Sequence, residues 1–239
     1  MTLEKKRVVV LGGSSGIGLA VAKAAARESA ELIIVSSRKT NIDRALAELP
    51  RSAQGHAIDL SDEARIRNLF EVIGPLDHLV YTAGENLKLG TLKDTNINEA
   101  RQFWTLRYWG AFAAVKYGAP NIRSGGSIVL TSGLASQRPH AGWTVASSIC
   151  GAMEGLTRAL AVELAPIRVN AVCPGVVRTP LWNSMSEADR TTLYQQMNEK
   201  LLVGHVGESE EVSEAYLYLM RQTYGTGQPI VVDGGGALV

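Results

Sequence analysis

A glycine-rich turn near the start of the chain has the spacing of an anion-binding loop. Residues 12–18 read GGSSGIG, with an apolar run at 8–11 before them and helical spacing after them. Gly12 allows the tight turn, Gly16 lets the backbone approach a pyrophosphate, and Gly18 lets the helix pack close to the strand. A helix N-terminus directs free N–H groups and the positive end of its dipole toward an anion. The pattern therefore predicts a phosphate site.

The glycine spacing by itself leaves other interpretations open. Glycine-rich turns also occur where only close packing is needed. A nucleoside-triphosphate loop is disfavoured, because no Gly-Lys-Ser/Thr follows the glycines.

Polar residues at the end of the next apolar run bear on the type of nucleotide. Ser36, Ser37 and Arg38 follow the run at 32–35, where dinucleotide-binding folds usually carry an acidic residue for the ribose hydroxyls of NAD. A guanidinium and hydroxyl groups suit a 2′-phosphate instead. We therefore predict that NADP(H) is preferred over NAD(H). The alternative is that Arg38 is a solvated surface residue.

Strand-like and helix-like stretches alternate along the chain and would position these residues. Strands are predicted at 7–11, 32–35, 53–58, 79–81, 127–131, 167–172 and 230–232, and longer helices from 17, at 40–49, 61–73, about 98–117, about 145–164 and around 212–220. Thr40 and Asp43 have the spacing of a capping box that opens the second helix, and Ser61 is the predicted cap of the third. Right-handed βαβ crossovers then give an α/β fold, a doubly wound parallel sheet with helices on both faces. We expect one Rossmann-type domain over residues 1–239.

The composition narrows the possible partners. The formal net charge is +1, from 24 basic and 23 acidic residues, so we expect neither nucleic-acid nor membrane binding. The two cysteines, Cys150 and Cys173, fit a reducing compartment and have no zinc-site spacing. The N-terminal residues run directly into the first strand, so we expect no signal peptide and a cytoplasmic protein.

Several separated stretches together resemble the short-chain dehydrogenase/reductase family over essentially the whole chain. They are residues 12–18 (GGSSGIG), Asp59-Leu60, Ala83-Gly84, 127–132 (SIVLTS), 155–164 (GLTRALAVEL), 168–180 (RVNAVCPGVVRTP) and 227–235 (GQPIVVDGG). The resemblance implies a Rossmann-type domain that binds a nicotinamide cofactor and assembles as a homo-oligomer, a dimer or a tetramer.

The resemblance also implies cofactor contacts, position by position. These are Gly12, Ser14, Ser15, Gly16, Ile17 and Gly18 at the pyrophosphate, Asp59 and Leu60 at the adenine, Ala83 and Gly84 at the adjoining ribose, and Pro174, Gly175, Val177 and Thr179 at the nicotinamide. Each also has a structural interpretation, such as a helix-entry residue for Asp59 or a turn for Pro174-Gly175.

The catalytic positions depart from the family pattern. The family protonates the carbonyl oxygen with a Tyr, supported by a Lys four residues later, a Ser that polarises the carbonyl and an Asn on an earlier helix. Ser132 matches the Ser, but Val145 falls at the Tyr position and Ile149 at the Lys position. No realignment supplies the pair, because the chain has no tyrosine between 117 and 194 and no lysine between 116 and 200. Neither replacement can donate a proton.

The Asn position holds Arg107, which we expect to polarise an acceptor oxygen as a permanent cation. The alternative is an Arg107 that only pairs with a carboxylate on a helix surface. His140 and Tyr108 are other candidate proton donors. A hydrolase centred on Ser132 is disfavoured, because no G-x-S-x-G turn surrounds it.

Two functions remain open. The first is an NADP(H)-dependent oxidoreductase with a non-standard active site, acting on an unidentified carbonyl or alcohol. The second is a catalytically impaired cofactor-binding or subunit-interaction protein. Residues 181–207 have the length of a substrate lid. Five small residues, Gly151, Ala152, Gly155, Ala159 and Ala161, leave a smooth helix face for a second subunit or for the sheet.

Overall fold

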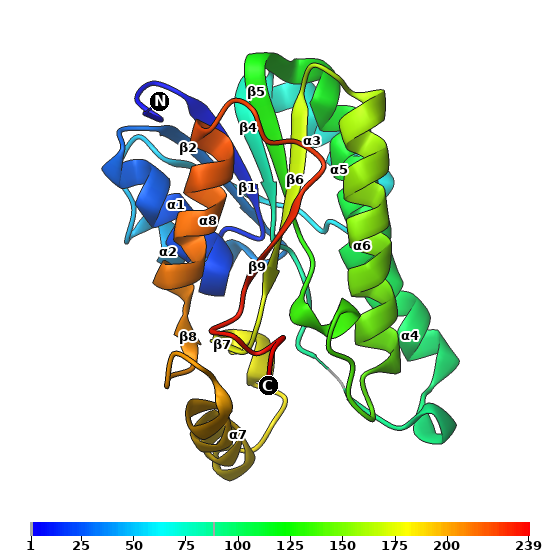
Figure 1. Ribbon diagram of the computed structural model, residues 1–239. Helices are drawn as coiled ribbons and strands as arrows, with labels where there is room; N and C mark the ends of the chain where they lie inside the picture. Colours follow the sequence, from blue (N-terminus) through cyan, green and yellow to red (C-terminus); the bar gives the residue numbers. More distant parts are fainter. Residues whose placement is uncertain (1, 88) are drawn as a thin grey trace.

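A seven-stranded parallel sheet in the order β3-β2-β1-β4-β5-β6-β9 forms the centre of the computed structural model, which describes residues 2–87 and 89–239 (Figure 1). The strands are β1 (Arg7–Leu11), β2 (Glu31–Ser36), β3 (Gln54–Ala57), β4 (Leu76–Tyr81), β5 (Ile122–Thr131), β6 (Arg168–Pro174) and β9 (Pro229–Val232). The predicted α/β fold is confirmed: the order steps outward in both directions from β1, as in a doubly wound sheet.

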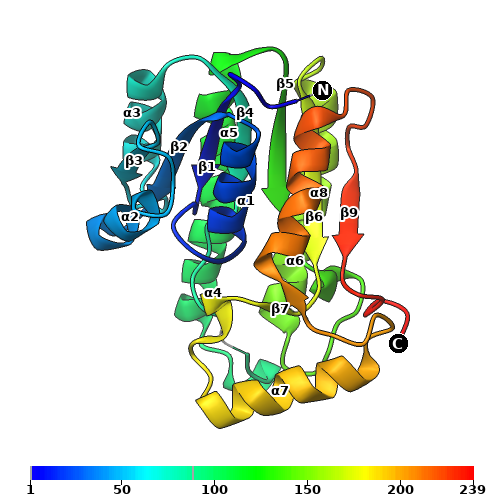
Figure 2. The ribbon, with the colours of Figure 1, turned by 90° about the vertical axis from the view of Figure 1, so that its left-hand side faces the viewer.

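Helices cover both faces of the sheet (Figures 1 and 2). One face carries α1 (Gly16–Arg27), α2 (Lys39–Leu46) and α8 (Ser209–Arg221), and the other carries α3 (Glu63–Ile73), α4 (Ile97–Trp104), α5 (Ala111–Gly118) and α6 (Thr144–Glu163). Short 3-10 turns are η1 (Leu92–Asp94), η3 (Ala119–Asn121), η4 (Leu134–Ser136) and η5 (Pro180–Trp182), and β7 (Val177–Arg178) pairs with β8 (Gly207–Glu208).

The two helix layers explain the unbroken apolar run of the first strand. Val9 and Leu11 pack into the core on the α3, α5 and α6 side, whereas Val8 and Val10 pack on the α1 and α8 side. All four are fully buried. A strand that is covered on both faces has apolar residues at successive positions, rather than apolar residues alternating with polar ones.

The long helix predicted near 98–117 is interrupted by a π-helical turn, η2 (Thr105–Gly110), between α4 and α5. The Tyr81 hydroxyl donates a hydrogen bond to the Leu106 carbonyl in this turn, at 2.6 Å. A Cβ on Gly110 would lie 2.4 Å from that hydroxyl. A side chain inserted into a helix in this way widens the backbone, and Arg107 lies in the widened turn.

The predicted cap of the second helix is wrong. The helix begins at Lys39, not at Thr40, and ends at Leu46 rather than at residue 49. The Asp43 carboxylate, expected to complete a capping box with Thr40, instead accepts two bonds of 2.8 Å from the Lys39 ammonium. An ion pair across one helical turn takes the place of the cap.

The predicted cap of the third helix is also wrong, by one residue. Asp62 caps the helix, because its carboxylate accepts bonds from the N–H groups of Ala64 and Arg65 at 2.9 and 3.2 Å. The Ser61 hydroxyl donates to the Asp59 carboxylate instead, at 2.7 Å. Either residue type can cap a helix, and the local turn at Asp59 decides between them.

The polar stretch at 181–207 contains a further helix, α7 (Glu187–Lys200), with no buried residue. This helix lies across the lower end of the molecule, beyond the carboxyl ends of the strands (Figure 2). The Leu87 N–H donates to the Leu181 carbonyl at 3.1 Å, and the Ser184 hydroxyl to the Leu87 carbonyl at 2.8 Å. The start of the stretch is thus tied to the loop after β4. Within the described residues no helix is long and apolar enough to cross a membrane.

Candidate active site

The glycine-rich turn after β1 is packed so closely that two of its glycines leave no room for a side chain. A Cβ on Gly12, whose φ is 91°, would lie 2.5 Å from the Ala83 nitrogen. A Cβ on Gly18 would lie 2.3 Å from the Gly12 carbonyl oxygen. Three of the predicted cofactor contacts therefore meet at one place, where bare backbone faces the carboxyl edge of the sheet.

The N-terminus of α1 supplies the donors of this site. Its N-cap residue, Ser15, makes no side-chain cap bond, so no side chain of that residue satisfies the first-turn N–H groups. A Cβ on Gly16 would lie 3.3 Å from the Thr179 Cβ, so a residue far along the chain stands beside the turn. Open backbone and the positive end of a helix dipole together fit a pyrophosphate.

The end of β2 carries the groups predicted to distinguish NADP(H) from NAD(H). The Ser14 hydroxyl donates to the Ser36 hydroxyl at 2.8 Å, linking the glycine turn to β2. Ser37 and Arg38 are exposed. Arg38 forms no ion pair with any residue that the structure describes, which leaves its guanidinium available for a phosphate.

The residues predicted to lie at the adenine, Asp59 and Leu60, follow shortly after β3. The Asp59 carboxylate accepts bonds from the Ser61 N–H at 2.9 Å and from the Ser61 hydroxyl, which lower the pKa of the Asp59 carboxyl below its usual value. Leu60 is buried in the core. Asp59 thus has a local role in the turn that precedes the helix cap at Asp62.

The residues predicted to face the nicotinamide lie at the end of β6 and just after it. Pro174 ends the strand, and the Gly175 N–H donates to the Val232 carbonyl at 3.0 Å. A Cβ on Gly175 would lie 2.8 Å from the Asp233 Cα, so this glycine also serves a close backbone approach. Val177 is buried in the core on the α1 and α8 side.

Arg107 and Glu85 form the charged centre of the site. The Arg107 Nε and the Glu85 Oε2 lie 3.4 Å apart, and an Arg107 Nη2 donates to the Glu85 carbonyl. Burial raises the pKa of the Glu85 carboxyl and lowers the pKa of the Arg107 guanidinium, while each charge partly offsets the shift of the other. A carboxylate does pair with Arg107, but in the interior of the site and not on a helix surface.

Two neighbours fix the guanidinium. The Arg107 Cζ lies 5.2 Å from the centroid of the Phe103 ring, in a cation–π contact one turn back on α4. A Cβ on Gly84 would lie 2.7 Å from the same Cζ. Any larger residue at 84 would therefore displace Arg107.

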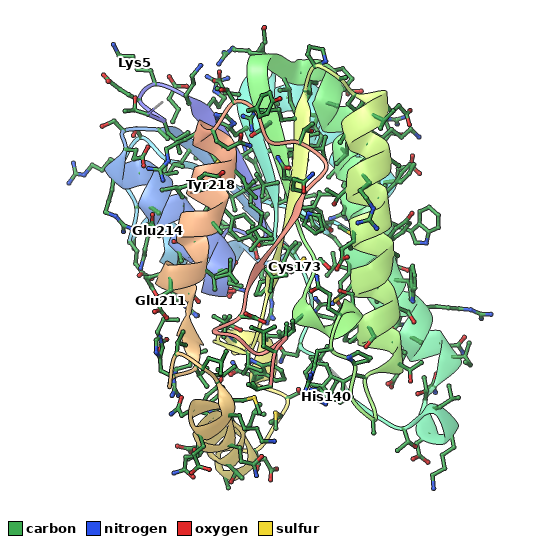
Figure 3. The ribbon with its side chains drawn as sticks, viewed as in Figure 1. Lys5, His140, Cys173, Glu211, Glu214 and Tyr218 are labelled. Carbon is green, nitrogen blue, oxygen red and sulfur yellow. The ribbon has the colours of Figure 1, made fainter. Side chains whose placement is uncertain are left out.

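Ser132 and Arg107 both lie close to Cys150, on α6. The Ser132 hydroxyl donates to the Cys150 carbonyl at 2.9 Å. Burial raises the pKa of the Cys150 thiol, and Ser132 and Arg107 oppose that shift. Cys173, at the centre of the molecule in Figure 3, has its pKa raised by burial to about 12. Neutral thiols here are poor nucleophiles.

Val145 and Ile149 lie in the first turns of α6 and pack against hydrocarbon. Ile149 belongs to the core with 4% of its surface exposed, and Val145 packs against the same core from its rim. Between them, the Ser147 hydroxyl is buried without a hydrogen-bond partner among the described residues. This part of the site holds no charge.

The other two candidate proton donors, His140 and Tyr108, pack against aromatic rings. His140 is exposed in the loop before α6, where its ring stacks edge-on against Trp143 with centroids 5.6 Å apart (Figure 3). Tyr108 is in an aromatic group with Trp104 and Trp109, at centroid distances of 5.5 and 5.0 Å. Among residues 2–87 and 89–239, no group of three acidic, histidine or cysteine residues could hold a metal ion.

Glu85 and Cys150 contact the predicted site residues Arg107 and Ser132 but were not among the residues singled out from the sequence. Glu85 directly follows Ala83-Gly84, and an acidic residue in that place was the available signal. Cys150 follows the Ile149 position directly on the same helix. Neither could be assigned before η2 and α6 were known to meet at this edge.

Comparison with known protein families gives one match over nearly the full length. A family model described as enoyl-(acyl carrier protein) reductase matches residues 12–236. The short-chain dehydrogenase/reductase ATR9 of Stachybotrys chlorohalonatus is 37% identical over 255 residues, which cover 100% of this chain and 99% of that protein.

Solved structures agree with this match. A small-chain dehydrogenase in complex with NADPH is 36% identical, with a TM-score of 0.84, over 99% of this chain and 100% of that one. The MalC reductase/Diels-Alderase of Malbranchea aurantiaca is 30% identical, with a TM-score of 0.90, over 99% of this chain and 97% of that one.

Proposed function

This chain belongs to the short-chain dehydrogenase/reductase family of NAD(P)H-dependent oxidoreductases, and from that premise we propose that it is an NADP(H)-dependent reductase of a small carbonyl or imine compound with a rebuilt active site. The observation that carries the proposal is the buried Arg107 cation at the carboxyl edge of the sheet, beside an open pyrophosphate turn. When bound, the nicotinamide supplies the hydride.

The preference for NADP(H) is supported by Ser37 and Arg38. Their exposed hydroxyl and unpaired guanidinium suit a 2′-phosphate, and no carboxylate stands there to receive ribose hydroxyls. The similar dehydrogenase crystallised with NADPH is consistent with this preference.

We propose further that Val145 and Ile149 occupy the positions where the family carries its Tyr and Lys. Arg107 then takes over the electrostatic part of catalysis by polarising the acceptor oxygen, with Ser132 as a second hydroxyl near it. A preorganised charge at the site of developing negative charge contributes about 10²–10³-fold in rate. Arg107 itself does not give up a proton, because the pKa of a guanidinium stays far above neutral.

Two structural roles belong to the same proposal. Residues 181–207, with α7 tied to the loop after β4, would act as the substrate lid. The exposed small residues Gly151 and Gly155, beside a Val162 that is 82% exposed, would meet a second subunit in a dimer or tetramer.

A second candidate function is supported by one observation. Ile149 is integrated into the hydrocarbon core, so the cationic support for the nicotinamide ribose is replaced by packing. This is what a cofactor-binding protein that has lost its chemistry would contain.

Stereospecific transfer of deuterium from labelled NADPH distinguishes the two functions. We expect labelled product from a panel of ketones and imines, and none from a Gly18→Ala variant. The variant Val145→Tyr/Ile149→Lys should reduce standard ketones in an Arg107→Asn background and not with Arg107 kept. NADPH binding without transfer to any acceptor would favour the second candidate.

A further inference from the structure

Glu85 directly follows Gly84 in the loop after β4, and its Oε2 lies 3.4 Å from the Arg107 Nε. We propose that Glu85 is the group that donates the proton to the acceptor oxygen, with Arg107 as its charge partner. This inference rests on the proposed reductase function and supplies the one part of the reaction that Val145 and Ile149 cannot perform.

The contact between the two side chains is incomplete in a way that points to a third polar group. The Glu85 Oε2 and the Arg107 Nε are both buried, yet neither has a hydrogen-bond partner among the described residues, although they lie 3.4 Å apart. In an ion pair with only a structural role such atoms are hydrogen-bonded, because a buried polar atom without a partner destabilises the folded state by about 1–3 kcal/mol. An acceptor oxygen bound here would receive hydrogen bonds from both.

The exposure of the pair suits proton exchange. About a third of the Glu85 side chain, 33%, remains exposed, against 23% of the Arg107 side chain. The carboxyl group is thus in contact with the buried guanidinium on one side and near solvent on the other. After each turnover, the carboxylate can recover its proton from water.

The charges around Glu85 come from several elements. Arg107 faces it from η2, Tyr81 from β4, and Cys150 adjoins Arg107 from α6, while Asp59 acts on Tyr81 from the loop after β3. Burial raises the pKa of the Glu85 carboxyl, Arg107 opposes that rise, and the net direction is upward. Glu85 therefore stays protonated to a higher pH than an exposed glutamate does.

The reduction adds one hydride and one proton to the acceptor carbonyl group. The acceptor carbon receives a hydride, and the electron pair of the C=O bond moves to the oxygen. That oxygen forms a bond to the Glu85 proton while the carboxyl O–H bond breaks. The products are an alcohol, an oxidised nicotinamide and a Glu85 carboxylate neutralised by Arg107; solvent then returns the proton.

The test compares Glu85→Gln with Glu28→Gln, its matched control. Glu28 also pairs with an arginine while partly buried, 2.6 Å from Arg221, with side chains 22% and 34% exposed. Glu28 lies just after α1, outside the proposed site, and its second carboxylate oxygen accepts a 3.1 Å bond from the Leu3 N–H. Glu28→Gln therefore reports the effect of disturbing a partly buried, paired carboxylate away from the site.

Three readouts are taken on the full chain. NADPH affinity should stay within about threefold in both variants. The ¹³C signal of the Glu85 carboxyl, assigned by its absence from Glu85→Gln, should titrate above the usual range near 4.3, and higher still in Arg107→Met. The rate of hydride transfer should fall about 10²–10⁴-fold in Glu85→Gln, and in the wild type it should fall as pH rises through the carbon-detected midpoint.

The outcomes distinguish the proton-donor role of Glu85 from the reductase function itself. If wild type and Glu85→Gln reduce the acceptor at equal rates with the same pH profile, Glu85 is not the donor and the reductase proposal stands. An ordinary Glu85 midpoint would overturn the inference in the same way. If the wild type binds NADPH but reduces no ketone or imine, the proposed function fails, and the proton-donor role fails with it.

Discussion

The loop after β1 and the segments after β4 face the same edge of the sheet, but the first presents backbone groups and the second presents side chains. The first presents backbone: glycines with no room for a Cβ and an uncapped helix N-terminus. The second presents side chains, Glu85 and Arg107, held in a π-helical turn by Tyr81. A backbone site tolerates no added atoms, whereas a side-chain site can be rebuilt by substitution while the strands stay in place.

The comparison predicts the largest loss of binding from the backbone site. Gly18→Ala should weaken NADPH binding by at least about 100-fold, because the added Cβ would lie 2.3 Å from the Gly12 carbonyl and deform the turn. Fluorescence titration measures it, with circular dichroism to check that the variant is folded.

The matched control is Gly155→Ala on α6. No described residue of the chain lies within 4 Å of the added Cβ, so NADPH affinity should be unchanged. The oligomeric state is measured alongside, because residue 155 lies on the proposed subunit contact. Equal affinity in both alanine variants would contradict the assignment of the turn.

Arg107→Met tests the side-chain site. We expect kcat/KM for carbonyl reduction to fall about 10²–10³-fold, because a preorganised charge is lost from the acceptor oxygen. NADPH affinity should stay within about threefold, since the backbone site is intact. A variant that loses binding and retains turnover would reverse the roles of the two regions.

Arg38→Ala tests the nucleotide preference alone. The ratio of NADPH to NADH affinity should fall about 10–100-fold, as one or two charge-assisted hydrogen bonds to the 2′-phosphate are lost. Arg44 is an exposed arginine within α2, the helix that begins directly after Arg38. Arg44→Ala should leave the ratio unchanged. A constant ratio in both variants would make Arg38 a solvated surface residue.

Tyr81→Phe tests whether the π-helical turn positions Arg107. Removing the hydroxyl leaves the Leu106 carbonyl without its 2.6 Å donor, so unfolding should become easier by about 1–2 kcal/mol. The rate of reduction should fall about tenfold with a nearly constant KM. Tyr216→Phe, which also deletes a buried hydroxyl bond, 2.7 Å long, should lower stability but not the rate.

The smallest expected effect is on the pH dependence of stability. The folded pKa of Glu85 is raised, so the stabilisation from its protonated form is complete below the unfolded value of about 4.3 and is lost as pH rises through the folded pKa. The melting temperature of Glu85→Gln relative to wild type should therefore rise between about pH 4 and the folded pKa. A pH-independent difference would contradict the shift.

The two regions also differ in what the amino-acid sequence could predict. Glycine spacing after an apolar run specifies a backbone conformation, so the turn at Gly12 to Gly18 followed from local pattern, as the doubly wound parallel sheet followed from the alternation of strands and helices. Glu85 could not be identified in this way. The proposed role of Glu85 depends on its contact with Arg107. Arg107 lies in the π-helical turn η2, where the Leu106 carbonyl accepts a hydrogen bond from the Tyr81 hydroxyl of β4.

Local competition explains the two wrong helix caps. Thr40 and Asp43 have capping-box spacing, but Lys39 takes the carboxylate. Ser61 and Asp62 can both cap, and the turn at Asp59 already uses the serine hydroxyl. In both places two sequence patterns were compatible with the local residues, and only the folded contacts distinguish them.

The central claim is that the backbone region keeps its function although the side-chain region has been rebuilt. The most direct test is titration of the wild-type chain with NADPH, followed by energy transfer from tryptophan to nicotinamide, with NADH alongside. We expect saturable micromolar binding of NADPH and weaker binding of NADH. Absence of binding by both nucleotides would contradict the claim, because it would mean that the backbone region does not form a working cofactor site.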